Sequence, residues 1–444
     1  LDRSERLGPR FNAYVTLTRE LALKQARQAE SELRAGHDRG LLHGIPYAAK
    51  DLVAVRGYKT TWGARPYANQ EFDYDAAIFE RLSAAGAVLI GKAAMIELAG
   101  GLGYTTGAAS FTGPCRNPWN PDCWTCGSSS GSGAVVAAGL APWAIGSDTR
   151  GSILCPSSWC GISGLRPSFG RVSRRGAMAI AWSMDKLGPM ARCADDCGII
   201  LSVIAGHDPL DHDSLPFGIA EFHYAGPKSS LAGFRVGRLT NSWNEMEPGL
   251  AESVDDACRV LEKTGASVKD AAIPDGPFEE AAELTILMEA TAAFDDLIQS
   301  GRCSELNDPL GQVNGYASRQ FSAYDYVQVP RVRAPLQKRI DKLFDHFDVI
   351  VSAAQSSAAK PLGGNSDKEE REEESRAINQ KAPDGISSLC GLPSISVPCG
   401  FSKSHLPFGL QFSARALNDE AVIRAAHVFQ SHTDWHRQRP PHLD

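Results

Sequence analysis

The sequence predicts an α/β protein whose sheet is covered by helices on both faces, and two observations support this fold class. First, amphipathic stretches with helical spacing alternate along the chain with short apolar stretches typical of buried strands. Second, 444 residues with 43% hydrophobic and 22% charged residues are enough to bury a large core. Strands that alternate with helices have both faces of their sheet covered.

The helices and strands can be placed in order from the residues at their ends. Gly36 ends the first predicted helix, and Asp75 is placed to cap the second. Asn418 is expected to cap the last helix, with Glu420 in its first turn. The predicted helices cover 19–36, 76–86, 249–265 and 418–433, and the predicted strands cover 87–91, 234–239, 266–274, 348–353, 394–398 and 408–414.

Composition and charge disfavour several classes of partner. The net charge of −7 argues against nucleic-acid binding, because contacts to phosphates need a basic face. The chain contains no apolar run as long as the roughly 18 residues of a membrane helix. The N-terminus has no signal-peptide core, so we expect no membrane partner and a cytoplasmic location. The sequence begins at Leu1 rather than Met, which is consistent with a missing leading segment.

Eleven cysteines in a chain without a secretory signal predict reduced thiols. Cys123 and Cys126 form the only CxxC pair, and a zinc site would need a second pair or two well-spaced histidines. No such partner follows, so we expect these two cysteines to be packing residues. The sequence accordingly predicts no metal and no cofactor.

The serine-rich stretch CGSSSGSG at 126–133 matches several motifs weakly. The stretch is not typical of a flexible linker, because it runs directly into a long apolar segment. It is not a phosphate loop either, because it lacks the Gly-Lys-Ser/Thr ending of that motif. Ser129 formally occupies the nucleophile position of G-x-S-x-G. However, the preceding NPWNPDCWTC has the composition of a loop, whereas that motif requires a strand.

Other hydrolase motifs are also incomplete. Ser183-x2-Lys186 and Lys263-Thr264-Gly265 match two of the motifs of penicillin-binding proteins and β-lactamases. No Ser-Asp-Asn lies between them, and the second match falls at a predicted helix end rather than on a strand. The eleven histidines form no HExxH or HxH set, so the sequence selects none of them as a base.

A stronger candidate follows the apolar run APWAI, where a buried strand is expected to end near Ser147. Small and polar residues cluster at this strand exit, where α/β folds place their chemistry, and Gly151 allows N–H groups beside Ser152 to converge as an oxyanion hole. An ordinary turn is the alternative. Lys50, alone in the apolar stretch GIPYAAKDLVA, is a candidate base, because burial lowers a lysine pKa. By pattern alone, a lysine that reaches the surface or pairs with Asp51 is the commoner outcome.

Together these motifs resemble the amidase signature family. The resemblance covers nearly the whole chain and is densest over 113–192, from GPCRNPWNPDCWTCGSSSGSG through IGSDTRGSILCPSSWCGISGLRPSFGRVSRRG to WSMDKLGPMAR. Further similar segments cover 44–64, 85–101, 386–401 and 406–414. An ordered set of this size is far more specific than any tripeptide.

The resemblance implies a role for each matching residue. Lys50, in the IP-x3-KD motif, matches the family's catalytic lysine, Ser128 matches the bridging serine held by a cis peptide bond, and Ser152 matches the nucleophile. The implied mechanism passes a proton from Ser152 through Ser128 to neutral Lys50 and forms an acyl-enzyme, which water hydrolyses. The matching oxyanion-hole amides are those of Thr149, Arg150, Gly151 and Ser152, which leaves loop and helix-start roles for Ser129, Ser130 and Ser132.

The sequence departs from the family pattern beside these positions. Arg150 replaces the first of two glycines before the nucleophile, and Cys126 replaces the first of two glycines before the bridging serine. Leu52 and Ala94 stand where asparagine is usual, and Leu154 stands where arginine is usual. We expect these changes to alter the surroundings of the site, such as the space and charge near the leaving group, and not the three catalytic groups.

The resemblance also implies one large domain over 1–444 with a central mixed β-sheet, a signature core over about 44–200 and a smaller insert or lid region over about 275–385. The acidic run SDKEEREEESR at 366–376 lies in this second region. We interpret it as a solvated helix face or surface loop, with a lid near the site as the alternative.

The implied activity is hydrolysis of the C–N bond in a small-molecule amide by a monomer or homodimer. Aryl amides, carbamates (urethanes) and esters are open as substrates. Two alternatives stand beside this hypothesis: the catalytic subunit of a transamidating complex, and a degenerate binding protein with the amidase fold. Aromatic residues in such motifs are more often core, but four are expected to line an apolar pocket: Tyr104, Trp124, Trp159 and Trp182.

Overall fold

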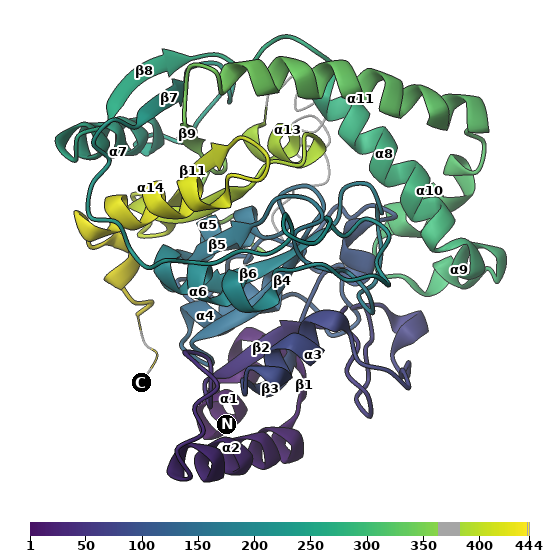
Figure 1. Ribbon diagram of the computed structural model, residues 1–444. Helices are drawn as coiled ribbons and strands as arrows, with labels where there is room; N and C mark the ends of the chain where they lie inside the picture. The colour runs from purple at the N-terminus through teal and green to yellow at the C-terminus, as the bar shows by residue number, and fades with distance from the viewer. Residues whose placement is uncertain (363–381, 442, 444) are drawn as a thin grey trace.

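An 11-stranded sheet runs through the centre of the protein (Figure 1). The computed structural model describes residues 1–362, 382–441 and 443. In spatial order the strands are β1 (Tyr14–Leu17), β3 (Val88–Ala93), β2 (Pro46–Lys50), β4 (Trp143–Asp148), β6 (Lys186–Ala191), β5 (Ser163–Arg166), β10 (Ser394–Phe401), β11 (Pro407–Ala414), β9 (Val349–Ala353), β7 (Arg235–Leu239) and β8 (Ser267–Ala271).

The sheet is mixed, as predicted, and its parallel pairs form two groups. Strand β2 lies between β3 and β4 and is parallel to both. Strand β7 lies between β8 and β9 and is parallel to both. The other neighbours pair antiparallel. The carboxyl ends of β2 and β4 therefore meet at one edge of the sheet, where parallel sheets place their functional residues.

Helices cover both faces of the sheet, which confirms the predicted fold class. Helices α3, α6, α14 and α7 pack side by side over one face, and α4 and α5 lie on the other. Side chains alternate along β2, so Ala48 joins the core around α4 whereas Tyr47 and Ala49 join the opposite core. The helices are α1 (Asp2–Phe11), α2 (Arg19–Arg34), α3 (Ala77–Ala84), α4 (Ser130–Ala137), α5 (Leu154–Cys160), α6 (Ala194–Ile204), α7 (Leu250–Lys263), α8 (Phe278–Ala293), α9 (Asp295–Gln299), α10 (Pro309–Ser318), α11 (Ala323–Leu343), α13 (Pro383–Leu389) and α14 (Asp419–Ser431).

Helices α8 to α11 gather at one end of the molecule in Figure 1, and α8 contacts α10, α11 and α13. These helices lie within the predicted insert or lid region at 275–385. Strand β9 of the same range belongs to the central sheet, so the described part of this region is not a separate layer. The acidic run at 366–376 lies outside the described residues, and its role as a lid stays a prediction.

The predicted elements are present, and of the two predicted helix caps Asn418 occupies the N-cap position whereas Asp75 does not. Helix α3 begins after Ala76, because the Asp75 carboxylate instead accepts a hydrogen bond from the Arg56 amide at 2.7 Å. Helix α14 does begin after Asn418, but the Asn418 side chain makes no capping hydrogen bond. Both helices are held by packing against the core rather than by a side-chain cap.

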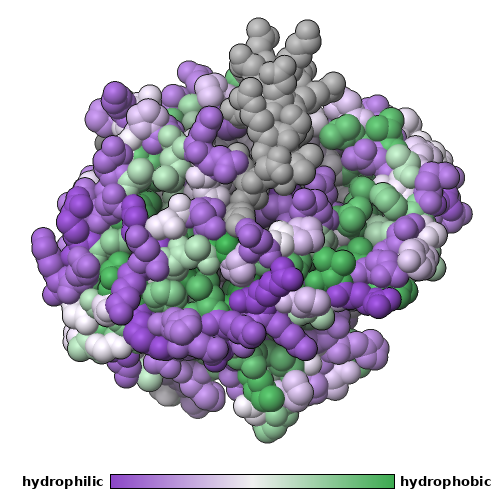
Figure 2. Space-filling view, turned by 90° about the horizontal axis from the view of Figure 1, so that it is seen from above, coloured by the Kyte–Doolittle hydropathy of each residue, from purple (hydrophilic) through white to green (hydrophobic). Residues whose placement is uncertain are grey.

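Hydrophilic residues surround and separate the apolar ones on the face seen in Figure 2. Among the described residues, no helix combines the length and the hydropathy that a membrane span requires.

Candidate active site

Lys50 is the last residue of β2, and its side chain is completely buried. Its Nζ donates hydrogen bonds to Ser128 Oγ at 2.7 Å and to Ser147 Oγ at 2.9 Å. The neighbouring Asp51 forms an ion pair with Lys92 instead, at 3.1 Å between Oδ1 and Nζ. Lys50 therefore neither reaches the surface nor pairs with Asp51, the two outcomes that the sequence pattern alone favoured.

Burial lowers the pKa of Lys50 to about 7, and the more distant charges of Asp148 and Asp185 partly oppose this shift. Within the described part of the chain, no carboxylate lies within ion-pair distance of the Lys50 amine. A substantial fraction of the amine is therefore neutral near pH 7, and a neutral amine can accept a proton.

Ser128 follows a cis peptide bond from Gly127 and is fully buried. Gly127 is required here, because a Cβ at this position would lie 2.6 Å from Ile96 Cγ1. Ser129 is also buried, but its Oγ donates to the Ser147 carbonyl at 3.1 Å and accepts from the Ser147 amide at 3.2 Å. Ser129 thus ties this loop to β4, and of these two neighbouring serines it is Ser128 whose hydroxyl faces Lys50.

The turn that carries Ser152 joins β4 to α5. Gly151 has φ +88°, and a Cβ there would lie 2.4 Å from Asp384 Oδ2, so only glycine fits. Asp148 holds the turn from inside, because its carboxylate accepts the Gly151 amide and the Ile153 amide, each at 2.8 Å. In the described structure the amides of Thr149, Arg150 and Ser152 have no acceptor, whereas the Gly151 amide is already engaged.

Ser152 is nearly buried, with 8% of its surface exposed. Its carbonyl accepts from the Ser129 amide at 3.3 Å, which brings its backbone next to the loop of Ser128. The described residues include no hydrogen bond between the Ser128 and Ser152 hydroxyls. Catalytic hydrogen bonds are often long without substrate and shorten in the complex, and the backbones that carry these two serines are already adjacent.

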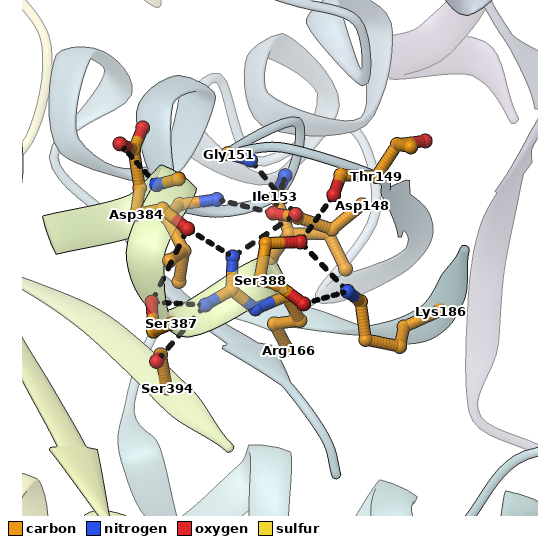
Figure 3. A network of polar contacts seen from close by, with 12 residues as sticks. Asp148, Thr149, Gly151, Ile153, Arg166, Lys186, Asp384, Ser387, Ser388 and Ser394 are labelled. Carbon is orange, nitrogen blue, oxygen red and sulfur yellow. Dashed lines mark hydrogen bonds and ion pairs between the residues drawn. The ribbon is translucent and has the colours of Figure 1, made fainter. Parts of the chain in front are cut away.

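A buried polar network supports this turn (Figure 3). Asp148 and Arg166 form an ion pair at 3.2 Å with both side chains fully buried. The pKa of the Asp148 carboxyl is lowered. Burial by itself would raise this pKa, but the positive charges of Arg166 and Lys186 and the hydrogen bonds from backbone amides have the larger combined effect. Lys186 Nζ donates to Ser388 Oγ at 2.7 Å, and that hydroxyl donates to the Thr149 carbonyl. Asp148 is therefore charged, and both ends of the turn are fixed.

Comparison with known proteins agrees with this arrangement. The Amidase family model matches residues 1–423. The A subunit of the glutamyl-tRNA(Gln) amidotransferase from Cupriavidus pinatubonensis is 35% identical over 479 residues, which cover 99% of this chain and 93% of that protein. The chain belongs to the amidase signature family.

Solved structures of the family are similar over nearly the whole length. Native peptide amidase from Stenotrophomonas maltophilia superposes with a TM-score of 0.85 at 28% identity, over 100% of this chain and 93% of that one. The A subunit of the glutamyl-tRNA(Gln) amidotransferase from Thermotoga maritima superposes with a TM-score of 0.78 at 25% identity, over 97% and 89%. The fold predicted from the family resemblance is confirmed.

Arg150, the first departure from the family pattern, points away from the turn toward α8. Its Nη2 forms an ion pair with Glu279 Oε2 at 2.6 Å, and the Arg150 side chain is 36% exposed whereas that of Glu279 is 7% exposed. Burial raises the pKa of Glu279 to about 7, although Arg150 opposes the shift. In this member of the amidase signature family, the glycine position beside the candidate nucleophile is occupied by Arg150, which forms an ion pair with Glu279.

Three of the four predicted pocket aromatics form a continuous row. The ring centroids of Tyr104 and Trp124 are 6.0 Å apart, and those of Trp124 and Trp159 are 5.7 Å apart. Trp124 also lies against Gly127, because a Cβ on that glycine would meet its ring at 3.3 Å. Trp159 is a core residue with 5% exposure, and its Nε1 donates to the Ser357 carbonyl.

Trp182 has a different place from that row. It is 45% exposed and lines a cavity of about 220 Å³ beside Thr149. Thr149 Oγ1 donates to Asp185 Oδ1 at 2.7 Å in the wall of this cavity. The cavity therefore borders the candidate oxyanion turn, and its other lining residues include Ser147, Met178, Ile180 and Lys186.

The prediction that all cysteines are reduced is wrong for one pair. Cys126 and Cys155 form a disulfide, with a Cα–Cα distance of 5.9 Å. Cys123, the other half of the CxxC motif, is a free buried thiol, as expected of a packing residue. The disulfide could not be inferred from the sequence, because a cysteine pair can bond only where the fold brings the two Cα atoms within about 7 Å.

Four residues of the site were missed by the sequence analysis. Ser147 was treated only as a strand end, yet its hydroxyl is the second partner of Lys50. Asp148 lies in the quoted GSDTRGSI, and its place directly at the strand exit was a usable signal. Arg166 and Glu279 had no signal, because their partners lie far away in the sequence.

Proposed function

We propose that this chain is a serine-dependent amidohydrolase that cleaves the C–N bond of small-molecule amides through an acyl-enzyme on Ser152. The observation that carries the proposal is the 2.7 Å hydrogen bond from the fully buried Lys50 amine to Ser128 Oγ. A buried lysine is costly unless it has a function or a charged partner, and Lys50 faces hydroxyl groups. Ser152 lies next to this pair, on a turn that Asp148 holds in place.

In the proposed mechanism the neutral Lys50 amine accepts the Ser128 proton while Ser128 accepts the proton of Ser152. Ser152 Oγ then bonds to the carbonyl carbon of the substrate. The proton returns from Lys50 through Ser128 to the leaving nitrogen, the C–N bond breaks, and the amine departs. Water attacks the acyl-enzyme by the same route and frees Ser152.

The oxyanion of each tetrahedral intermediate requires hydrogen-bond donors that are free in the resting enzyme. The amides of Thr149, Arg150 and Ser152, which have no acceptor among the described residues, meet this requirement. The Gly151 amide donates to Asp148, so we assign Gly151 mainly to the geometry of the turn. Any residue except proline at position 150 would supply the same backbone N–H donor.

The surroundings favour substrates with a bulky apolar group. Trp124 packs beside the loop of Ser128, and Trp182 lines the cavity next to Thr149. Aromatic side chains offer flat apolar surfaces for aryl groups. Aryl amides, anilides, carbamates and esters are therefore the first substrates to compare.

Labelling with a fluorophosphonate, followed by mass spectrometry, tests the proposal. We expect one stable adduct on Ser152 and turnover of at least one substrate from a panel of amides, anilides, carbamates and esters. Ser152→Ala is the blank for both measurements. An adduct on Ser129, or undiminished turnover by Ser152→Ala, contradicts the assignment, and a chain that is unlabelled and turns over no substrate is a binding protein with the amidase fold.

A catalytic subunit of a transamidating complex is the second candidate function. It is favoured by the 35% identity to the A subunit of a glutamyl-tRNA(Gln) amidotransferase across 93% of that protein. Such a protein would show little turnover alone and would co-elute with a stable partner when native extracts are separated by size. An isolated chain with full hydrolytic turnover and no partner supports the amidohydrolase.

A further inference from the structure

The Cys126–Cys155 disulfide links the two segments that carry the proposed relay serine and the proposed nucleophile. Cys126 directly precedes Gly127 and Ser128, and Cys155 lies in the first turn of α5, shortly after Ser152. The two cysteines are separated by 29 positions, and both serines lie between them in the sequence. The bond therefore closes a covalent ring that contains both hydroxyl groups.

The backbone of Cys126 indicates that its side chain has a role. Its φ is 63°, in the left-handed region, where a residue with a Cβ is disfavoured. Glycine would adopt this conformation without that cost. The cysteine side chain is 7% exposed, and its sulfur is bonded to Cys155, which is equally buried. A cysteine at position 126 therefore has an unfavourable backbone conformation, and its side chain supplies the disulfide to Cys155.

The cross-link is placed where small displacements matter. The relay requires the Ser128 and Ser152 hydroxyls to come within hydrogen-bond distance of each other, and a misplacement of about 1 Å can cost 100-fold in rate. The backbones already approach through the Ser129 amide and the Ser152 carbonyl, at 3.3 Å. The disulfide adds a second restraint on the opposite side of Ser128 in the sequence, so the relay serine is held between the two.

We propose that the Cys126–Cys155 disulfide is a positioning element for Ser128 and Ser152, so that turnover depends on the oxidation state of this bond. The inference rests on the proposed function. A dithiol reductant supplies two electrons and two protons: the S–S bond breaks, two thiols form, and the dithiol becomes a cyclic disulfide. Reoxidation by a disulfide such as oxidised glutathione reverses the exchange.

The test compares the parent enzyme with Cys126→Gly, Cys155→Ala and the double variant. Glycine suits the left-handed backbone at 126, so this variant removes the bond with little backbone penalty. Cys258→Ala, which removes a free buried thiol in α7, is the matched control. The rate of fluorophosphonate labelling at Ser152, kcat and KM are measured, and peptide mapping without reductant establishes the bond in the parent.

We expect labelling and kcat to fall about 10- to 100-fold in each variant that lacks the bond, with a smaller change in KM, and to stay at parental values in Cys258→Ala. Dithiothreitol should lower the labelling rate and kcat of the parent by the same factor. Oxidised glutathione should then restore both to their starting values. A bond that only stabilises the fold would lower the melting temperature and leave the labelling rate unchanged.

The possible failures are distinguishable. A parent that is not labelled on Ser152 rejects the proposed function. A parent that is labelled, while the folded variants are labelled at the parental rate, rejects the positioning role. Alkylation of both cysteines in the unreduced parent rejects it as well. If the variants do not fold, the dithiothreitol titration of the folded parent decides: an unchanged rate at complete reduction rejects the inference.

Discussion

Two neighbouring strands each carry a fully buried lysine, and the two lysines have different surroundings. Lys50 of β2 and Lys92 of β3 lie one register position apart. Lys92 pairs with Asp51 at 3.1 Å, whereas Lys50 faces two hydroxyls. Burial lowers the pKa of both amines, and for Lys92 the contact with Asp51 directly opposes it. Burial alone therefore does not make a base; a base also requires that no carboxylate touches the amine.

The largest effect should come from removing Lys50, which has no carboxylate within ion-pair distance among the described residues. In Lys50→Met we expect kcat/KM to fall by about 10³- to 10⁴-fold, because the proposed general base is lost, while the fold is retained. Turnover and the melting temperature together check this. Lys50→Met with near-parental turnover would show that the two lysines do not differ in the proposed way.

Lys92→Met should have its effect on stability instead. It leaves the Asp51 carboxylate buried without its partner, which typically costs about 3–5 kcal/mol of unfolding free energy. Urea unfolding measures the loss, and turnover per folded molecule should stay close to parental. Replacing both partners, in the double variant Lys92→Met with Asp51→Leu, should recover part of the lost stability. If the ion pair contributes nothing, the single and double variants will have the same unfolding free energy.

The serine that faces Lys50 can be compared with its neighbour. Ser128→Ala should lower kcat by about 10²- to 10³-fold, because the proton path is broken. Ser129→Ala should cost about 1–3 kcal/mol of stability, because the buried Ser147 amide and carbonyl lose their partner. Equal rate losses in the two variants would contradict the assignment of the relay to Ser128.

The smallest effect is a pH dependence. Lys50 must be neutral to act, so kcat/KM should rise about tenfold per pH unit below 7 and level off above it. The folded pKa of about 7 lies below the unfolded value of 10.5, so the unfolded chain binds more protons between these values. Lys50 therefore destabilises the fold fully below about pH 7, and the penalty disappears as the pH rises toward 10.5.

Measured stability should accordingly rise less between pH 7 and pH 10 in Lys50→Met than in the parent. Denaturant unfolding at several pH values measures this difference. A parental rate profile that is flat between pH 6 and pH 8 would place the Lys50 pKa elsewhere and remove the contrast with Lys92.

The sequence by itself determined the fold class, and each helix and strand that it predicted is present in the structure. Alternating helical and apolar stretches predict a covered sheet because each pattern depends on local periodicity. The ordered motifs indicated the family, and with it Lys50, Ser128 and Ser152 as site residues. The wrong helix cap at Asp75 shows the limit of local signals, because its carboxylate instead accepts a hydrogen bond from the Arg56 amide, 19 positions away.

Only the tertiary structure decided which groups touch. The sheet places β2 between β3 and β4. In this register Asp51 forms an ion pair with Lys92, and Lys50 donates hydrogen bonds to the hydroxyls of two serines that lie 78 and 97 positions away in the sequence. The same folding brings Cys126 to Cys155 and Arg150 to Glu279. Hydrogen bonds, ion pairs and disulfides depend on distances of a few ångströms, and such distances are set by how distant segments pack, which residue order alone does not specify.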